Sequence, residues 1–181
     1  MFQFKIQGRG GQGAQKAGEI LAEAFFREGR YVQTYSTYGG ARRGTPVSTF
    51  FREDDKPINL RCDIENPDVI ICFDASLVSD ALLKGATEDT LLLINSTNPP
   101  DYFANLGNFK IATIDAISIA RANQIGRFVN SILVGAFAAL MEKPNIDVLI
   151  QVVKDISPAK VEQNVNACLD GYNFFAKGGV K

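Results

Sequence analysis

A short, uninterrupted apolar segment near the middle of the chain constrains the fold more than any other feature. Residues 68–73 read Asp-Val-Ile-Ile-Cys-Phe, and after the aspartate no charged or strongly polar side chain interrupts the run. Such a segment is typical of a central strand of a parallel sheet, which is covered on both faces. The rest of the chain must therefore supply neighbouring strands and the helices that cover them.

The remaining sequence supplies both kinds of element in alternation. The other predicted strands are residues 2–7, 31–36, 47–52, 90–94 and 110–114. The predicted helices are residues 14–28, 76–84, 116–122, 127–141, 147–155 and 158–176. This order predicts an α/β fold: a single Rossmann-like domain over residues 1–181, with a mostly parallel sheet flanked by helices. In such folds ligands bind at the carboxyl ends of the strands.

Charge and hydropathy exclude several classes of partner. The net charge is -1 and the pI is about 5.5, so we expect neither nucleic acid nor an anionic membrane as the main partner. The first ten residues have neither a basic segment nor an apolar core, so no signal peptide is predicted. The longest apolar stretch, residues 132–141, is too short to span a bilayer. We therefore expect a cytoplasmic protein.

The chain has no histidine and only three cysteines, which are Cys62, Cys72 and Cys168. Catalysis by Ser-His-Asp or Cys-His groups is excluded, and so are histidine-ligated metals. Three scattered cysteines fall short of the four thiolates that an iron–sulfur cluster usually needs. We predict no catalytic residue and no metal site in this chain, and we interpret Cys72 as a small buried hydrophobic residue.

A glycine-rich turn follows the first predicted strand and precedes the first predicted helix. It consists of Gly8, Arg9, Gly10, Gly11, Gln12 and Gly13. Glycines in this context allow a tight turn and close backbone approach to a ligand, and the amides at the start of the helix favour an anion. Arg9 and Lys16 add positive charge nearby. The alternative is that these glycines serve only the turn and the packing of strand against helix.

The glycine-rich turn lacks the second feature of a site for NAD. A site for NAD requires an acidic residue at the end of the second strand to hold the ribose hydroxyls, and residues 33–38 contain none. Arg42 and Arg43 could instead meet the 2'-phosphate of NADP, so a stand-alone protein that binds NADP or a flavin remains an alternative. A dehydrogenase would also need an acid or base at the substrate, and no histidine is available.

A basic, glycine-rich loop joins the second and third predicted strands. We expect its anion-binding residues to be Tyr38, Gly39, Arg42, Arg43 and Gly44. Two adjacent arginines between glycines can meet a phosphate or carboxylate through paired hydrogen bonds. The alternative is a solvated loop whose arginines pair with the acids at 53–55.

The two loops together resemble the gamma subunit of pyruvate and related 2-oxoacid:ferredoxin oxidoreductases. The resemblance rests on Gly8-Arg9-Gly10-Gly11-Gln12-Gly13 and on Tyr38-Gly39-x-x-Arg42-Arg43-Gly44-x-Pro46-Val47. It continues through Lys56-Pro57-Ile58, the strand before Asp74, and Asn130 in a late helix, so it covers essentially the whole chain. The family commonly has Pro-Glu where this chain has Gly40-Ala41, so no role of that carboxylate carries over.

The resemblance implies a place in an enzyme that oxidatively decarboxylates a 2-oxoacid such as pyruvate and joins the acyl group to coenzyme A. Thiamine diphosphate, iron–sulfur clusters and coenzyme A are then held mainly by the alpha, beta and delta partner subunits, and electrons pass to ferredoxin. The glycine turn with Arg42 and Arg43 is expected to face a coenzyme A phosphate or a partner's carboxylate. A non-catalytic assembly protein with the same fold is the third alternative.

Three polar residues outside the loops are interpreted as structural. Asp74 and Asp115 follow predicted strands and precede helices, a position typical of helix N-caps. Asn130 lies in the apolar face of a helix, where a buried amide needs partners, so we expect a hydrogen-bond anchor rather than a ligand contact.

Overall fold

The computed structural model describes residues 1–38, 44–176 and 178. The strands are β1 (Phe2–Arg9), β2 (Tyr31–Tyr38), β3 (Pro46–Asp54), β4 (Val69–Cys72), β5 (Leu91–Asn95) and β6 (Lys110–Ile114). The α-helices are α1 (Ala14–Arg27), α2 (Asp80–Leu83), α3 (Ala116–Ala122), α4 (Asn130–Met141), α5 (Ile146–Ile156) and α6 (Val161–Ala176). Two 3-10 helices, η1 (Ala75–Leu77) and η2 (Pro100–Leu106), complete the described elements.

The strands form one sheet in the order β2-β3-β1-β4-β5-β6. β1, β4, β5 and β6 pair in parallel, whereas β3 runs antiparallel to both β1 and β2. Only β3 opposes the common direction, because it is the next described element after β2 and pairs antiparallel with it. The predicted α/β fold with a mostly parallel sheet is confirmed.

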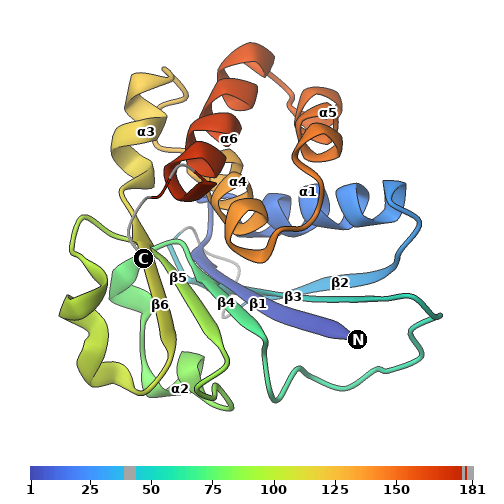
Figure 1. Ribbon diagram of the computed structural model, residues 1–181, viewed down its shortest axis with the longest axis vertical. Helices are drawn as coiled ribbons and strands as arrows, with labels where there is room; N and C mark the ends of the chain where they lie inside the picture. Colours follow the sequence, from blue (N-terminus) through green and yellow to red (C-terminus); the bar gives the residue numbers. More distant parts are fainter. Residues whose placement is uncertain (39–43, 177, 179–181) are drawn as a thin grey trace.

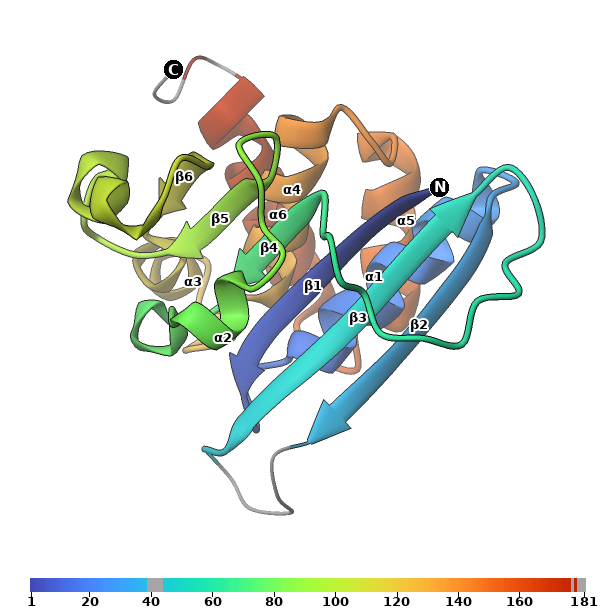
Figure 2. The same ribbon diagram turned by 90° about the horizontal axis from the view of Figure 1, so that it is seen from below.

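Helices cover one face of the sheet almost completely. Figure 1 shows α1 lying over β2 and β3, with α4 and α6 above the centre of the sheet and α5 above α1. The core on this face is aromatic: the Phe4 ring stacks on Phe51 with centroids 4.3 Å apart and meets Phe137 at 4.9 Å. The opposite face is covered by α2, η1 and η2 beneath β4–β6 (Figure 2).

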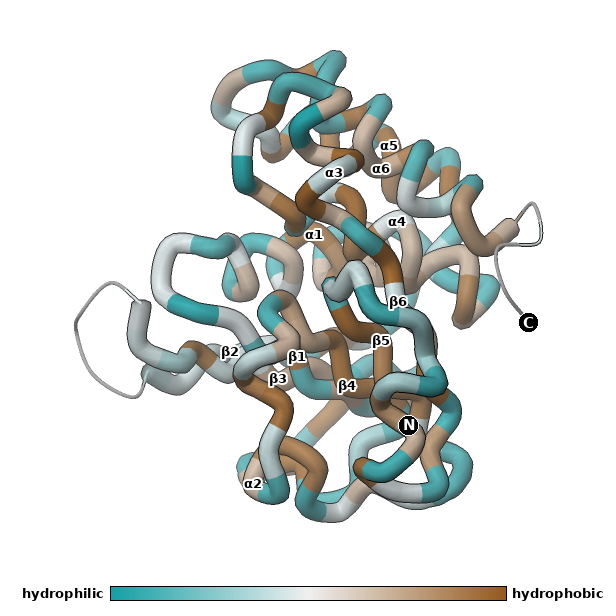
Figure 3. The backbone as a smooth tube through the Cα atoms, turned by 90° about the vertical axis from the view of Figure 1, so that its left-hand side faces the viewer, coloured by the Kyte–Doolittle hydropathy of each residue, from teal (hydrophilic) through white to brown (hydrophobic). Residues whose placement is uncertain are grey.

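β4 has the buried character that its sequence predicted, since all four residues are buried between the two layers. Residue hydropathy agrees with this arrangement: the central strands and inner helices are mostly hydrophobic (brown in Figure 3), and the outer turns are mostly hydrophilic (teal). Burial raises the pKa of the Cys72 thiol to about 12, which keeps it protonated and inert. Cys168 is fully buried in α6 and behaves in the same way.

α4 and α6 approach one another backbone to backbone. A Cβ atom at Gly135 would overlap the carbonyl oxygen of Cys168, and one at Gly171 would overlap the carbonyl oxygen of Ile132. Only glycine at these two positions permits the contact. The contact in turn fixes α6 and the segment before it over the amino end of α1.

Two predicted helices differ from the structure. The single helix expected at 76–84 is wrong: a turn of 3-10 helix is followed by the short α2, because Ser79 adopts an extended conformation and caps α2 with its hydroxyl. The helix expected from 127 begins only at Asn130, after a turn through Gly126 in the left-handed region. The predicted caps Asp74 and Asp115 are confirmed. No described helix has the length and apolar character required to cross a membrane.

Replacing Gly135 or Gly171 with alanine tests the close helix contact. Each added methyl group must push α4 from α6, so we expect each variant to lose about 1–3 kcal/mol of unfolding free energy. Urea denaturation followed by circular dichroism measures this. Asn166→Ala, on the exposed side of α6, is the control and should unfold like the parent chain. An unchanged midpoint for both glycine variants would contradict the close contact.

Candidate functional site

The glycine loop between β1 and α1 is tied to the far end of the basic loop. The N–H of Gly10 donates to the carbonyl of Thr45 at 2.9 Å, and the N–H of Gly44 donates to the carbonyl of Gly10 at 3.3 Å. Gly11 and Gly13 both have left-handed backbone angles, with φ of 92° and 90°, which explains glycine at these positions. The two stretches singled out in the sequence therefore meet in space.

Gln12 closes the turn from within. Its side-chain oxygen accepts a hydrogen bond from the Arg9 N–H at 2.6 Å, and its own N–H donates to the Arg9 carbonyl at 2.9 Å. The side chain is therefore used to shape the loop, and the remaining loop amides are left for other contacts.

The amino end of α1 carries uncompensated positive character. Gly13 caps the helix without a side chain, and the first turn contains no acidic residue. The first amides of any helix lack partners within the helix, so they and the helix dipole present a partial positive charge. Lys16 stands in the same turn, and its ammonium group binds Glu19 at 3.0 Å.

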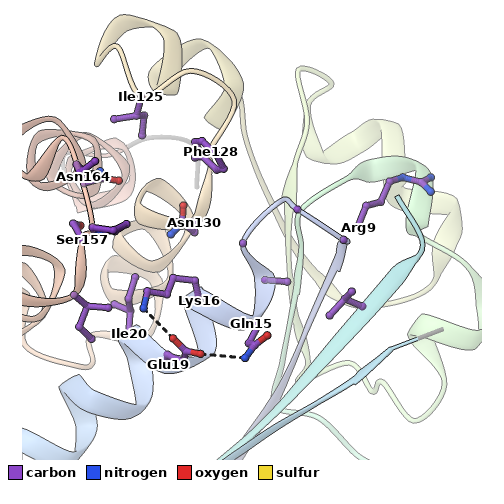
Figure 4. Close-up of a pocket in the computed structure, with 18 of the residues that line it drawn as sticks. Arg9, Gln15, Lys16, Glu19, Ile20, Ile125, Phe128, Asn130, Ser157 and Asn164 are labelled. Atoms are coloured by element: carbon purple, nitrogen blue, oxygen red, sulfur yellow. Dashed lines mark hydrogen bonds and ion pairs between the residues drawn. The ribbon is translucent and has the colours of Figure 1, made fainter. Parts of the chain in front are cut away.

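A pocket of about 650 Å³ opens beside this helix end. One wall is the glycine loop with the first turns of α1, and the other is formed by the residues before α4 and between α5 and α6 (Figure 4). The second wall consists of Ile125, Phe128, Asn130, Ile156, Ser157, Pro158, Ala159, Lys160 and Asn164. The pocket thus has a positive end at α1 and a largely apolar wall opposite.

Asn130 lies directly against the glycine loop. Its side-chain carbon is 3.3 Å from the position that a Cβ would occupy at Gly13. Within the described part of the chain its amide has no side-chain hydrogen-bond partner, and it lines the pocket. The expectation of a buried structural anchor is therefore wrong, because α4 begins at this residue and leaves the amide at the pocket wall.

Arg9 points away from the pocket. Figure 4 shows its side chain directed to the opposite side from Lys16 and Asn130. Its guanidinium group donates to the Asp74 carboxylate at 2.8 Å, to the Ser76 hydroxyl at 2.9 Å and to the Gly44 carbonyl at 3.2 Å. Arg9 therefore braces the loop that bounds the pocket.

Asp74 is held in its charged form by this arrangement. Partial burial by itself would raise its pKa, but hydrogen bonds from Ser76 and Arg9 outweigh the burial and leave the pKa below its ordinary value. The pair links the ends of the neighbouring strands β1 and β4, which is the point where the strand order reverses and where α/β folds commonly bind dinucleotides.

A second hollow of about 580 Å³ lies at the carboxyl ends of β4, β5 and β6. Its main polar side chains already have hydrogen-bond partners within the chain. Asn95 donates to the Phe73 carbonyl and accepts from the Ala116 N–H, each at 3.0 Å, and Asp115 accepts from the N–H and the hydroxyl of Ser118. Among the described residues no group of acids or cysteines is arranged to hold a metal ion.

Known proteins identify the family. The sequence matches the family described as pyruvate ferredoxin/flavodoxin oxidoreductase over residues 3–174. The chain belongs to this family. It is 38% identical over 181 residues to the pyruvate synthase subunit PorC of Methanothermobacter marburgensis, covering 99% of this chain and 100% of that protein. It is 33% identical over 177 residues to the common subunit gamma of the pyruvate/ketoisovalerate oxidoreductases of Pyrococcus furiosus, covering 95% and 96%.

Solved structures of the family agree. The pyruvate oxidoreductase subunit PORC of Thermotoga maritima superposes with a TM-score of 0.86 at 30% identity, and the match covers 95% of each chain. A 2-oxoglutarate:ferredoxin oxidoreductase from Magnetococcus marinus shares the fold, with a TM-score of 0.78 at 20% identity, over 32% of its longer chain. The expected gamma subunit of a 2-oxoacid oxidoreductase is thereby confirmed.

The structure brings together most of the residues that the sequence singled out. Residues 8–13 lie beside Gly44, whose N–H donates to the Gly10 carbonyl. Tyr38 lies beside the start of α1, where its hydroxyl donates to the Gln15 side chain at 2.6 Å. Gly39, Arg42 and Arg43 lie outside the described residues. Most of the wall from the C-terminal half was missed, because Ser157 and Lys160 belong to no recognisable motif and lie opposite the glycine loop only through the helix packing.

The Arg9–Asp74 pair predicts a pH dependence. A carboxyl whose pKa is lowered by folding stabilises the protein at pH above its unfolded pKa of about 3.9, and this contribution disappears as the pH falls through the lowered folded value. Asp74→Asn should therefore cost about 1 kcal/mol at neutral pH, since the pair is partly exposed, and should flatten the loss of stability below about pH 4.

Urea unfolding at a series of pH values measures this effect. Asp89→Asn is the control, because its side chain is 90% exposed and pairs only at 3.6 Å with Lys110. If the unfolding free energies of the parent chain and of Asp74→Asn fall equally as the pH is lowered below about 4, the stabilising role of the pair is contradicted.

Proposed function

We propose that this gamma subunit works in an assembled enzyme that oxidatively decarboxylates a 2-oxoacid such as pyruvate, transfers the acyl group to coenzyme A and passes electrons to ferredoxin. Relatives named pyruvate synthase subunit and common gamma subunit support the reaction. The observation that carries the local role is the glycine loop, which borders a pocket with one positive end and one apolar wall.

Thiamine diphosphate and the iron–sulfur clusters are assigned to the alpha, beta and delta partner subunits. The sequence supports this division, since it has no histidine and only three cysteines, two of which are buried in the core. When bound by those partners, thiamine diphosphate supplies the carbanion chemistry and the clusters accept the electrons. This chain contributes binding and positioning, and none of its residues is assigned a bond-making step.

The proposed ligand at the glycine loop is a phosphate group of coenzyme A. The amides at the start of α1 supply partial positive charge from the described residues, and Arg42 and Arg43, which lie in the sequence between β2 and β3, add two cations. The apolar wall around Ile125, Phe128 and Ile156 suits the uncharged arm of the same molecule. The rival occupant is a carboxylate of a partner subunit.

We also propose a cytoplasmic location for the complex. All three cysteines are free thiols, which is typical of proteins in a reducing compartment.

Isothermal titration of the assembled complex with coenzyme A tests the local role. Arg42→Ala and Arg43→Ala should each weaken the affinity at least about tenfold, because each removes a charge-assisted contact to a phosphate. Arg61→Ala, which removes an exposed arginine elsewhere, should leave it unchanged. Unaltered affinity in both arginine variants would refute the phosphate contact, and reduced assembly of the complex would favour the partner carboxylate.

Native purification tests the complex itself. Tagged full-length chain should bring down larger subunits together with iron, acid-labile sulfide and thiamine diphosphate, and the complex should reduce ferredoxin with one 2-oxoacid from a panel when coenzyme A is present. A chain that is isolated alone and metal-free, and that binds NADP or FAD in a titration, would contradict the proposal and support the dinucleotide alternative.

A further inference from the structure

Two residues with left-handed backbone angles meet at the wall of the pocket. Among the described residues, only Gln124, Glu142 and Lys160 have a positive φ without being glycine. Lys160 lines the pocket with φ of 52°, and its ammonium group donates a hydrogen bond to the carbonyl of Gln124, whose φ is 57°. Such angles cost free energy in residues other than glycine and are concentrated at ligand-binding sites. The contact is therefore a candidate for a function beyond the stability of the fold.

Position 160 is locally unfavourable for a lysine. It immediately precedes α6, and its carbonyl accepts a hydrogen bond from the N–H of Asn164 at 2.9 Å, as a capping residue does. Serine, threonine, asparagine, aspartate and glycine are the residues preferred there. A positive charge at the amino end of a helix is also opposed by the helix dipole. The ammonium group, and not the fit to the backbone, is what distinguishes lysine from the residues that this position favours.

The turn that carries Lys160 is held in place from α4. The buried hydroxyl of Ser131 donates to the side-chain oxygen of Asn164 at 2.8 Å. The Asn164 amide in turn donates to the carbonyls of Ala159 and Lys160 at 3.2 and 3.0 Å. Asn164 lies in the same wall of the pocket (Figure 4). Because these bonds fix the backbone, the lysine side chain starts from a defined point on the wall, as a binding residue requires.

The cations that line the pocket differ in the partners they already have. Three of them belong to the described residues. Arg9 pairs with Asp74 on the other side of the glycine loop, and Lys16 pairs with Glu19, the one acid among the described lining residues. Lys160 is held by a neutral carbonyl. An anion attracts an ammonium group through its full charge, which a carbonyl lacks, so an anionic ligand can take the place of this carbonyl.

We propose that Lys160 binds a second anionic group of the ligand whose first anionic group lies at the amino end of α1. The inference rests on the proposed function, in which this ligand is coenzyme A. Coenzyme A carries a diphosphate in the middle of the molecule and a single phosphate on the 3' position of its ribose. A glycine turn that leads into a helix is a common site for a diphosphate, so the diphosphate lies at α1. The 3'-phosphate is the anionic group that remains for Lys160.

This arrangement makes Lys160 a determinant of specificity. The amino end of α1 can hold any ligand with a phosphate or a diphosphate, whereas the lysine adds a contact only for a ligand that carries the second group. Coenzyme A is thereby distinguished from 3'-dephospho-coenzyme A, which differs from it by that one phosphate. A site that gains affinity from a charged group discriminates strongly against an analogue without the group.

Isothermal titration of the assembled complex with coenzyme A and with 3'-dephospho-coenzyme A tests the contact. Lys160→Gln removes the charge and keeps an N–H donor, and it should weaken the affinity for coenzyme A at least about tenfold while changing that for the dephospho form less than about twofold. Lys160→Arg keeps the charge and should retain the preference for coenzyme A. Lys154→Gln, which removes an exposed lysine of α5 outside the pocket lining, is the control and should leave both affinities unchanged.

Lys160→Gly separates a role in binding from a role in folding. Glycine adopts the left-handed angle without strain and is favoured before a helix, so the urea midpoint of the full-length chain should be no lower than that of the parent. The preference of the complex for coenzyme A over the dephospho form should nevertheless be lost. A lower midpoint together with an unaltered preference would assign the lysine to the fold and overturn the inference.

Three titration results would also overturn it. The first is a parent complex that binds both ligands equally well. The second is an equal loss of affinity for both ligands in Lys160→Gln, and the third is no loss for either. A failure of the proposed function is recognised separately, because Arg42→Ala and Arg43→Ala then leave the affinity for coenzyme A unchanged.

Discussion

The ion pair between Arg9 and Asp74 joins the glycine loop of the candidate site to the segment that follows β4. Arg9 ends β1 and Asp74 follows β4, so a contact at 2.8 Å between residues 65 positions apart fixes the glycine loop to the centre of the sheet. The same guanidinium group holds the Gly44 carbonyl at the end of the basic loop. The glycine loop is therefore fixed on its sheet side, and Gly10, Gly11 and Gly13 border the pocket.

The other wall of the pocket depends on a different constraint, the backbone contact between α4 and α6. Gly135 and Gly171 allow the helices to approach, and this places residues 157–164 opposite the amino end of α1. A pocket that combines a positive helix end with an apolar wall results from these two constraints together. Such a pocket suits a ligand that carries both an anionic group and an uncharged chain.

The pocket borders more of α1 than its first turn, since Glu19 and Ile20 of the second turn also line it. Tyr38 at the end of β2 lines the same pocket, and its hydroxyl donates to the Gln15 side chain at 2.6 Å. The end of β2 is therefore held against the part of α1 that borders the pocket.

The sequence by itself determined the alternation of strands and helices, the buried character of β4, the strand–turn–helix context of residues 8–13 and the caps Asp74 and Asp115. These depend on local spacing and on backbone preferences that act within a few residues. Only the tertiary structure decided that β3 opposes the other strands, that Arg9 faces Asp74 and that Asn130 lines the pocket. Each of these depends on which distant segments become neighbours, because a side chain's partners are set by the order of the strands and the packing of the helices.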